Sequence, residues 1–358
     1  MGVKQIQGGL YMLKQLSVPQ KIFGAIIFLF AWNLFTEQAS SDERTGTITF
    51  LSDRNRDPLF RIDIMVYLID ADGSNEMPWM GSDGPIAWAP DGKSIAYHLH
   101  DPQDPFISVI YLHTPVILLE FSGPRPGPRP IIQIKEVTRQ FGGQTYLSPK
   151  WSPDGKRLAL TSTDGSPDGM TDVCVMDIEG IVLKNLTRSP GRDEVGSWSP
   201  DGSKIVFFSN RDGNGEIYVM GSNGRKQVNL TNHPALDAAP TWSPDGTQIA
   251  FHSNREGGQD DIYVMNPDGS NVVNLTRHPW EDRAPAWSPN GRWIAFHAFQ
   301  VGQRPDIYVM DANGGNRAQL TEDPGSDTDP TWVIRDRSLS VEVSSNQVTL
   351  WGRMKLER

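Results

Sequence analysis

The sequence predicts an all-β fold, a six-bladed β-propeller of four-stranded blades, and two observations lead to this prediction. First, a tryptophan recurs along the chain, at Trp88, Trp151, Trp198, Trp242, Trp287 and Trp332, and the intervals from Trp151 onward are 47, 44, 45 and 45 residues. This is the period of a propeller blade built from four short strands. Second, the same β-type segments and turns return between the tryptophans, and no helical period interrupts them.

One repeat, residues 240–276, shows the elements in order. PTW is a short extended piece, and SPDG fits a type I turn with Pro at its second position and Gly at its fourth. QIAFHS and DIYVMN are strands rich in β-branched and aromatic residues, separated by the polar turn NREGGQD. PDGSN turns again before a last, shorter strand, VVNLT. Such a unit has two faces to bury, and only neighbouring units can cover them.

The two ends of the chain complete each other. The segment 45–54 contains GTITFLSDR and matches the IAFHSNR strand, while VYLIDADGSN (66–75) matches IYVMNPDGSN, so the first unit lacks a WSPDG start. At the other end PTW (330–332) has the start, but VIRD replaces SPDG. We therefore expect the strand ending at Trp332 to close the first blade, which leaves the ring without an open edge. A seven-bladed ring that uses the tail is the alternative.

The predicted domain boundaries follow from this pattern. The propeller occupies residues 45–335, and residues 336–358 are a C-terminal tail that can add strands. Residues 1–41 have the plan of a secretory signal peptide, with three lysines before the apolar run IFGAIIFLFAWNLF (22–35) and small residues before Asp42. Met12 is an alternative start. A retained membrane anchor is the competing interpretation, but fourteen apolar residues fall short of the roughly 20 that span a bilayer. We expect a periplasmic or otherwise exported protein that is not integral to the membrane after cleavage.

Composition excludes several classes of protein. The chain of 358 residues has a formal net charge of −10, which argues against a nucleic-acid partner because phosphate binding needs a basic face. A single cysteine, Cys174, rules out an intrachain disulfide framework. The sequence contains no G-x-S-x-G, H-E-x-x-H, P-loop or paired-cysteine motif, so none of these common catalytic signals is present.

The repeated motifs WSPDGxxIAF, DIYVM, DGSN and NLT resemble the WD-repeat-like β-propeller units of the TolB family. The resemblance covers about residues 45–333, and five starts match, at 88–92, 151–155, 198–202, 242–246 and 287–291. It implies a six-bladed propeller in the bacterial periplasm. The resemblance to TolB also implies a second domain, of mixed α/β type, before the propeller. That domain is expected to be absent here, so the resemblance implies an exported TolB-like binding protein without implying TolB's own partners in the Tol–Pal envelope system.

Aspartates form the best candidate site. Five residues before a marker tryptophan stand Asp83, Asp193, Asp237, Asp282 and Asp327, and the unit at Trp151 has Tyr146 instead. The strand nearest the axis begins here, so we expect these carboxylates to converge at the mouth of the central channel. Close carboxylates repel one another unless a cation or a basic partner neutralises them, and carboxylate oxygens suit Ca²⁺. The competing interpretation is that each aspartate fixes its local turn through backbone hydrogen bonds.

Histidines are weaker candidates for a metal site. His233 and His278, in NHP and RHP, belong to loops beside the aspartates, whereas His98, His252 and His297 share one strand position, ten residues after their tryptophans. Ordinary loop and strand histidines are the competing interpretation for all of them. We expect no cofactor, with a Ca²⁺ ion in the central channel as the alternative.

The function that this pattern favours is binding rather than catalysis. A rigid repeated scaffold with variable turns is typical of a protein-binding or scaffold module, here in the bacterial envelope with the partner at the channel mouth. We expect a monomer with a protein partner. The alternative is a propeller-type lyase or hydrolase that acts on saccharides or peptides with a channel metal, which rests on analogy of fold alone.

Overall fold

The computed structural model describes residues 44, 46–54, 64–82, 84–100, 108–114, 133–136, 145–163, 169–179 and 183–333. The predicted signal peptide (1–41), Asp83 and the tail (336–358) lie outside the described residues. The chain divides into two units, Met1–Thr45 and Gly46–Arg358, and the fold concerns the second.

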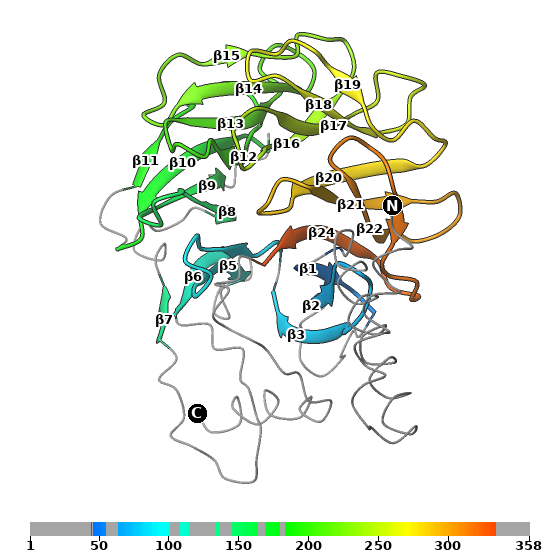
Figure 1. Cartoon of the computed structure of the whole chain (residues 1–358). Helices are drawn as coiled ribbons and strands as arrows, with labels where there is room; N and C mark the ends of the chain where they lie inside the picture. The colour runs from blue at the N-terminus through cyan, green and yellow to red at the C-terminus, as the bar shows by residue number, and fades with distance from the viewer. Residues whose placement is uncertain are drawn as a thin grey trace, which may run out of the picture. The chain divides into compact units, whose positions relative to one another are not determined.

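The described strands form six antiparallel four-stranded sheets, numbered here 1 to 6 from the N-terminus (Figure 1). Sheet 1 consists of β24 (Asp327–Trp332), β1 (Thr47–Ser52), β2 (Met65–Asp70) and β3 (Met77–Gly81). Sheet 2 consists of β4 (Ala87–Trp88), β5 (Ile95–His100), β6 (Ser108–Thr114) and β7 (Gln133–Glu136). Sheet 3 consists of β8 (Thr145–Trp151), β9 (Arg157–Thr163), β10 (Thr171–Asp177) and β11 (Leu183–Asn185). Sheet 4 consists of β12 (Asp193–Trp198), β13 (Lys204–Ser209), β14 (Glu216–Gly221) and β15 (Val228–Asn229). Sheet 5 consists of β16 (Asp237–Trp242), β17 (Ile249–Ser253), β18 (Asp261–Met265) and β19 (Val273–Asn274). Sheet 6 consists of β20 (Glu281–Trp287), β21 (Trp293–Phe299), β22 (Asp306–Asp311) and β23 (Ala318–Gln319).

The SPDG segments form the predicted turns between the first and second strands. In sheet 5 the backbone N–H of Gly246 donates to the carbonyl of Ser243 at 2.9 Å, and Gly246 has a φ of 73°. The Ser243 hydroxyl donates to Asp245 at 2.6 Å and accepts from the N–H of Gln248 at 2.9 Å. The recurrence of the SPDG sequence in the repeats therefore has a local cause, because these residue types satisfy the hydrogen bonds and the dihedral angles of the turn.

The two ends of the chain close sheet 1 as the sequence predicts. Strand β24 pairs antiparallel with β1, with Ile48 opposite Trp332 and Ser52 opposite Asp327. The indole of Trp332 stacks on Trp293 of sheet 6 with ring centroids 6.2 Å apart, and its N–H donates to the carbonyl of Ala286 at 2.9 Å. The C-terminal strand thus joins sheet 1 to sheet 6.

Each sheet buries its two faces against its neighbours. Six hydrophobic clusters of the described residues each join two successive sheets, and one of them joins sheet 6 back to sheet 1. Cluster members such as Ile48, Phe207, Phe251 and Phe296 are at most 1% exposed. The predicted class, an all-β propeller of four-stranded blades, is therefore confirmed, and the core lies between the sheets rather than at one centre.

The first strands of the sheets lie nearest the axis (Figure 1). They contact one another directly, because Trp151 of β8 donates to the carbonyl of Ala87 in β4, and Trp198 of β12 donates to the carbonyl of Lys150 in β8, both at 3.1 Å. Most of these strands carry a bulge two to three residues before their tryptophan. Ser148, Ala239, Ala284 and Asp329 adopt a left-handed backbone there, with φ between 49° and 51°.

Candidate functional site

The described aspartates of the predicted site lie at the starts of the strands nearest the axis. Asp193, Asp237 and Asp327 are the first residues of β12, β16 and β24, and Asp282 is the second residue of β20. All four side chains are 0% exposed. Asp83, the fifth predicted member, lies outside the described residues. The aspartates are therefore placed at the strand starts as predicted, but they are buried in the protein.

Each buried aspartate is paired with an arginine. A guanidinium nitrogen of Arg255 lies 2.8 and 2.9 Å from the two carboxylate oxygens of Asp237. Arg211 donates to one carboxylate oxygen of Asp193 at 3.0 Å, and Arg54 donates to one carboxylate oxygen of Asp327 at 2.6 Å. Arg317 binds both oxygens of Asp282, at 3.0 and 3.1 Å. The charge of every described aspartate in the set is thus neutralised inside its own sheet.

The arginines are held from two further sides. Each guanidinium stacks on a tyrosine of its sheet, with Arg54 4.3 Å from the ring centre of Tyr67, and Arg255 5.2 Å from that of Tyr263. The Nε–H of Arg255 also donates to the hydroxyl of Ser253 at 3.0 Å. Stacking on aromatic faces and charge-assisted hydrogen bonds make guanidinium groups suited to such buried pairs. Asp, Ser-x-Arg and Tyr therefore form one repeated structural unit in sheets 1, 4 and 5, and Arg317 takes the place of this arginine in sheet 6.

In sheet 3 the aspartate and the tyrosine of the unit are both replaced, while Ser162 keeps the position of the serine. Tyr146 stands in the place of the aspartate and is 1% exposed, and Cys174 replaces the stacking tyrosine. The Cys174 thiol lies 3.2 Å from the hydroxyl of Ser162, and burial raises its pKa to about 11. Cys174 is thus a buried side chain that is protonated at pH 7.

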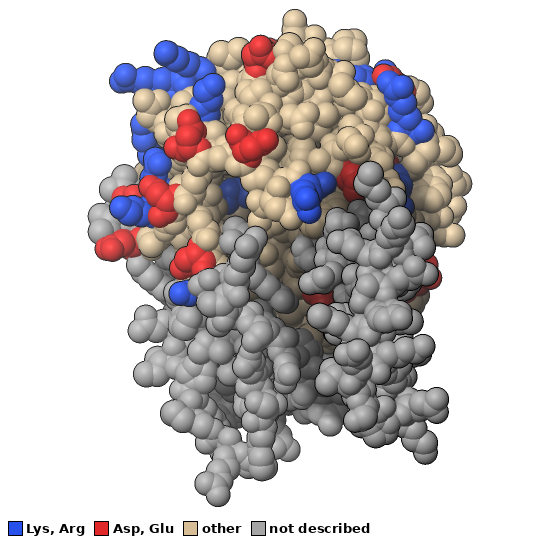
Figure 2. All heavy atoms as spheres, in the orientation of Figure 1, with Lys and Arg blue, Asp and Glu red and all other residues tan. Residues whose placement is uncertain are grey.

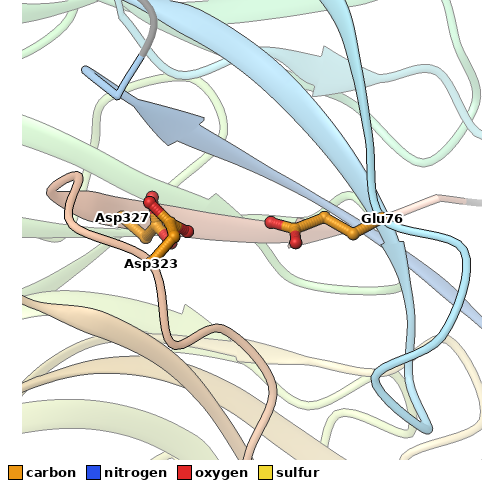
Figure 3. A group of neighbouring side chains, drawn as sticks. All are labelled: Glu76, Asp323 and Asp327. Atoms are coloured by element: carbon orange, nitrogen blue, oxygen red, sulfur yellow. The ribbon is translucent and has the colours of Figure 1, made fainter.

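The four described aspartates do not form a group of three potential metal ligands with one another. Among the described residues, one group of three potential metal ligands lies within 4.8 Å, and it consists of Glu76, Asp323 and Asp327 (Figure 3). Arg54 contacts all three carboxylates, so its guanidinium neutralises the group. A Ca²⁺ ion at Asp327 would have to displace this arginine. Ca²⁺ binding by the aspartates stays a prediction.

Burial perturbs two of these carboxyls. It raises the pKa of Asp282 to about 7, although the nearby charge of Arg317 acts in the opposite direction. It also raises the pKa of Asp327, again against the effect of its arginine.

Figure 2 shows acidic and basic side chains interspersed on the visible face, without a single large acidic patch.

His278 lies beside Asp282, and both loop histidines have local partners. The Nδ1 atom of His233 accepts from the N–H of Ala235 at 3.1 Å. The Nδ1 atom of His278 accepts from the N–H of Trp280 at 3.2 Å, and its Nε2 lies 3.5 Å from Asp282. Burial and the charge of Arg317 lower the pKa of His278 to about 4, so this histidine is neutral at pH 7. Their role as metal ligands is untested by these contacts.

Three of the six exposed large apolar side chains among the described residues lie on loops at one end of the propeller, and the other three, Val228, Val272 and Val273, lie on or beside outer strands. The first strand of each sheet runs from this end to the SPDG turn, so the loops between second and third strands and the connections between sheets also lie here. We call this end the start face. Val301 between β21 and β22 is 89% exposed, Met170 before β10 is 40% exposed, and Leu236 before β16 is 39% exposed.

Sequence reasoning missed the arginine partners and the exposed apolar residues of the start face. The arginines carried a signal, because Ser52-Asp-Arg54, Ser209-Asn-Arg211 and Ser253-Asn-Arg255 occupy the same place in their repeats. Arg317 had no such sequence signal. It stands directly before the outer strand of sheet 6, and at this position other sheets have residues such as Glu76 and Gln227. Single apolar residues in loops, such as Val301, have no sequence pattern that marks them.

Comparisons with known proteins agree with this fold. The TolB β-propeller domain family matches residues 144–283. A crystal structure of TolB from Acinetobacter baumannii is 25% identical, with a TM-score of 0.65, and covers 83% of this chain and 70% of that chain. A TolB candidate from Agrobacterium tumefaciens is 20% identical, with a TM-score of 0.57, over 80% and 92% of the two chains, which shows the shared fold.

A curated relative gives a shorter match. An uncharacterised protein of Agrobacterium fabrum is 34% identical over 90 residues, and the match spans 25% of this chain and 27% of that protein. No helix among the described residues is long and apolar enough to cross a membrane.

Proposed function

Because this chain contains a TolB-type β-propeller, we propose that it is a protein-binding module of the bacterial envelope whose partner engages the start face. We further propose that it acts as an exported monomer. The basic and then apolar N-terminal sequence supports export, since it has the plan of a secretory signal.

One observation carries the choice of face. Met170, Leu236 and Val301 come from three different loops, yet all three expose apolar surface at the same end of the propeller. Exposed apolar side chains on loops of a rigid scaffold are typical of protein-binding surfaces. A partner that covered them would gain roughly 25 cal/mol for each Å² of apolar surface removed from water.

The buried Asp–Arg pairs support this proposal by fixing the loops from below. Asp193, Asp237, Asp282 and Asp327 all lie where a start-face loop enters its sheet, and each is tied to an arginine. A binding surface that is already ordered loses less conformational entropy when its partner docks. In this proposal the aspartates act by holding the surface rather than by contacting the partner.

We also propose that the ring is complete with the six described sheets. The support is the cycle of six hydrophobic clusters, in which sheet 6 packs on sheet 1 through Trp293 and Trp332. A seventh sheet would have to be inserted into one of these packed interfaces.

Affinity capture tests the proposed face. The immobilised protein is used to bind proteins of an envelope extract, and the wild type is compared with a Met170→Asp, Val301→Asp double variant. The matched control is Val228→Asp, Val273→Asp, because these side chains are also exposed, at 52% and 49%, but lie on outer strands. We expect the start-face variant to lose the captured partner and the outer-strand variant to retain it. The opposite pattern would move the binding site to the outer strands.

A further inference from the structure

One turn of the propeller carries two basic residues that its counterparts lack. The turn between the third and fourth strands reads Asp-Gly-Ser-Asn in sheets 1 and 5, at residues 72–75 and 268–271. In sheet 4 the same turn, residues 223–226, reads Asn-Gly-Arg-Lys, so Arg225 and Lys226 replace serine and asparagine. The turn thereby changes from one negative charge to two positive charges, in a chain whose formal net charge is −10.

The backbone of the turn does not require these two residues. Lys226 has a left-handed backbone with a φ of 57°, and Asn75 and Asn271 adopt the same conformation at 56° and 53°. Asparagine enters this region more readily than lysine. The N–H of Arg225 donates to the side-chain oxygen of Asn223 at 3.0 Å, a contact that the serine of the other two turns also makes. Serine and asparagine therefore satisfy the turn, and the two positive charges indicate a role outside it.

Two further basic residues lie against this turn. The ammonium group of Lys184, on the outer strand of sheet 3, donates to the carbonyl of Asn223 at 3.0 Å. The N–H of Ser222 donates to the carbonyl of Ser203 at 2.8 Å, which brings Lys204, the next residue along the chain, to the turn as well. We call the group formed by Lys184, Lys204, Arg225 and Lys226 the basic corner.

The basic corner is exposed and has no acidic partner. All four of its residues are exposed, and none forms an ion pair within 4.0 Å with a carboxylate of the described residues. Asp201 belongs to the adjoining SPDG turn, and its carboxylate accepts from Ser199 and Ser203 instead. Basic side chains gather at the upper left of the visible face in Figure 2, over the ends of β11 and β15. Because third strands run away from the start face, the basic corner lies at the opposite end of the propeller.

Exposed valines lie beside the basic corner, on the rim between sheets 4 and 5. Val228 is 52% exposed and Val272 is 37% exposed. Val228 lies opposite Val219, which packs in the cluster shared by sheets 4 and 5, so Val228 is on the side of its sheet that faces sheet 5. Val272 has the place that Gln227 has in sheet 4, and Gln227 donates to the carbonyl of Leu186 directly after the outer strand of the preceding sheet. Val272 is therefore on the side of sheet 5 that faces sheet 4.

We propose that the basic corner and this rim bind the surface of a lipid bilayer with anionic headgroups. The four basic side chains contact headgroup phosphates, and Val228 and Val272 enter the boundary between headgroups and acyl chains. Basic residues next to exposed aliphatic residues are typical of proteins that bind at a membrane surface. The valines favour a bilayer over a soluble acidic partner, which offers no apolar phase. This inference is independent of the protein partner at the start face.

Vesicle co-sedimentation of the full chain tests the proposal. The probes are vesicles of phosphatidylcholine alone and vesicles of phosphatidylcholine mixed with phosphatidylglycerol. The apolar N-terminal segment is the same in the wild type and in every variant, so differences between them report the basic corner and the rim. We expect tighter binding to the anionic vesicles, and we expect this preference to fall as the salt concentration rises. Equal binding to both kinds of vesicle would overturn the proposal.

The repeat supplies a charge variant that the fold accepts. The double variant Arg225→Ser, Lys226→Asn introduces the residues that sheets 1 and 5 have in this turn, so it should keep the melting temperature. We expect it to bind the anionic vesicles about 25-fold more weakly, since each basic residue near an anionic surface contributes about fivefold. The matched control Arg277→Ser, Arg292→Ser removes two exposed charges elsewhere and should leave the affinity unchanged. Equal weakening by both double variants would show an effect of net charge alone and overturn the proposal.

A second variant distinguishes a bilayer from a soluble acidic partner. Val228→Ser, Val272→Gln removes the exposed apolar surface and keeps the four charges, and glutamine is the residue that sheet 4 has at the second position. We expect it to lower the affinity for anionic vesicles at least about fivefold and to leave the binding of polyglutamate unchanged. Unchanged binding to the vesicles, together with equally tight binding of polyglutamate, would assign the basic corner to an acidic peptide and overturn the bilayer proposal.

Discussion

Replacing Arg255 by alanine should strongly destabilise the propeller, because it leaves the Asp237 carboxylate buried without its partner. Asp237 is 0% exposed, and both of its oxygens lie within 2.9 Å of the same guanidinium nitrogen. Removing one partner of such a buried pair costs about 3–5 kcal/mol. For a domain of this size that corresponds to a fall in melting temperature on the order of 10 °C.

A double-mutant cycle separates the ion pair from the stacking of Arg255 on Tyr263. The cycle uses Arg255→Met, Asp237→Leu and the double variant, and it measures unfolding free energy by urea titration with a check that the denaturant slope stays constant. We expect the double variant to recover most of the stability that either single variant loses, since an apolar pair can replace a buried ion pair at little cost. The exposed Arg225→Ala is the control. A loss for Arg255→Ala no larger than that of this control would refute the reasoning.

Three further predictions concern closure, pH and the turns. Trp332→Ala should lower the unfolding free energy by roughly 3–5 kcal/mol, because Trp332 is 4% exposed and joins sheet 1 to sheet 6; a loss below about 1 kcal/mol by urea titration would contradict that closure. Burial and the charges of Asp327 and Asp323 raise the pKa of Asp306 to about 6 in the folded state, above its usual range, so its ionisation destabilises the fold as pH rises from about 4 to 6. Asp306→Asn should therefore raise the melting temperature more at pH 7.5 than at pH 4, and an equal effect at both pH values would exclude this carboxyl as the cause. Ser243→Ala should cost about 1 kcal/mol through loss of its contacts to Asp245 and Gln248, whereas the exposed Thr247→Ala should cost less; equal losses in urea titrations would show that the turn does not depend on this serine.

Local rules explain why the repeat predicts so much of this fold. The SPDG turns satisfy their own hydrogen bonds, and the closure by Trp332 follows from counting which unit lacks a first strand. Strand content and the order of the sheets are therefore set by segments of fewer than ten residues each, and these are visible in the sequence.

The site was predicted less completely because it depends on contacts between strands. The position of Asp237 at the start of its strand follows from spacing, but the guanidinium that neutralises it lies eighteen residues later, in another loop. Sequence reasoning treated the aspartates as neighbours of one another, whereas the structure gives each of the four described aspartates an arginine partner inside its own sheet.

Site-specific photocrosslinking in cells is the most direct test of the central claim, that a protein partner binds the start face. A photoreactive amino acid is introduced at position 301, where Val301 is 89% exposed on the start face, and separately at position 273, where Val273 is 49% exposed on an outer strand. The account predicts one dominant crosslinked protein from position 301 and none of that size from position 273. Crosslinking from position 273 with none from position 301 would contradict it.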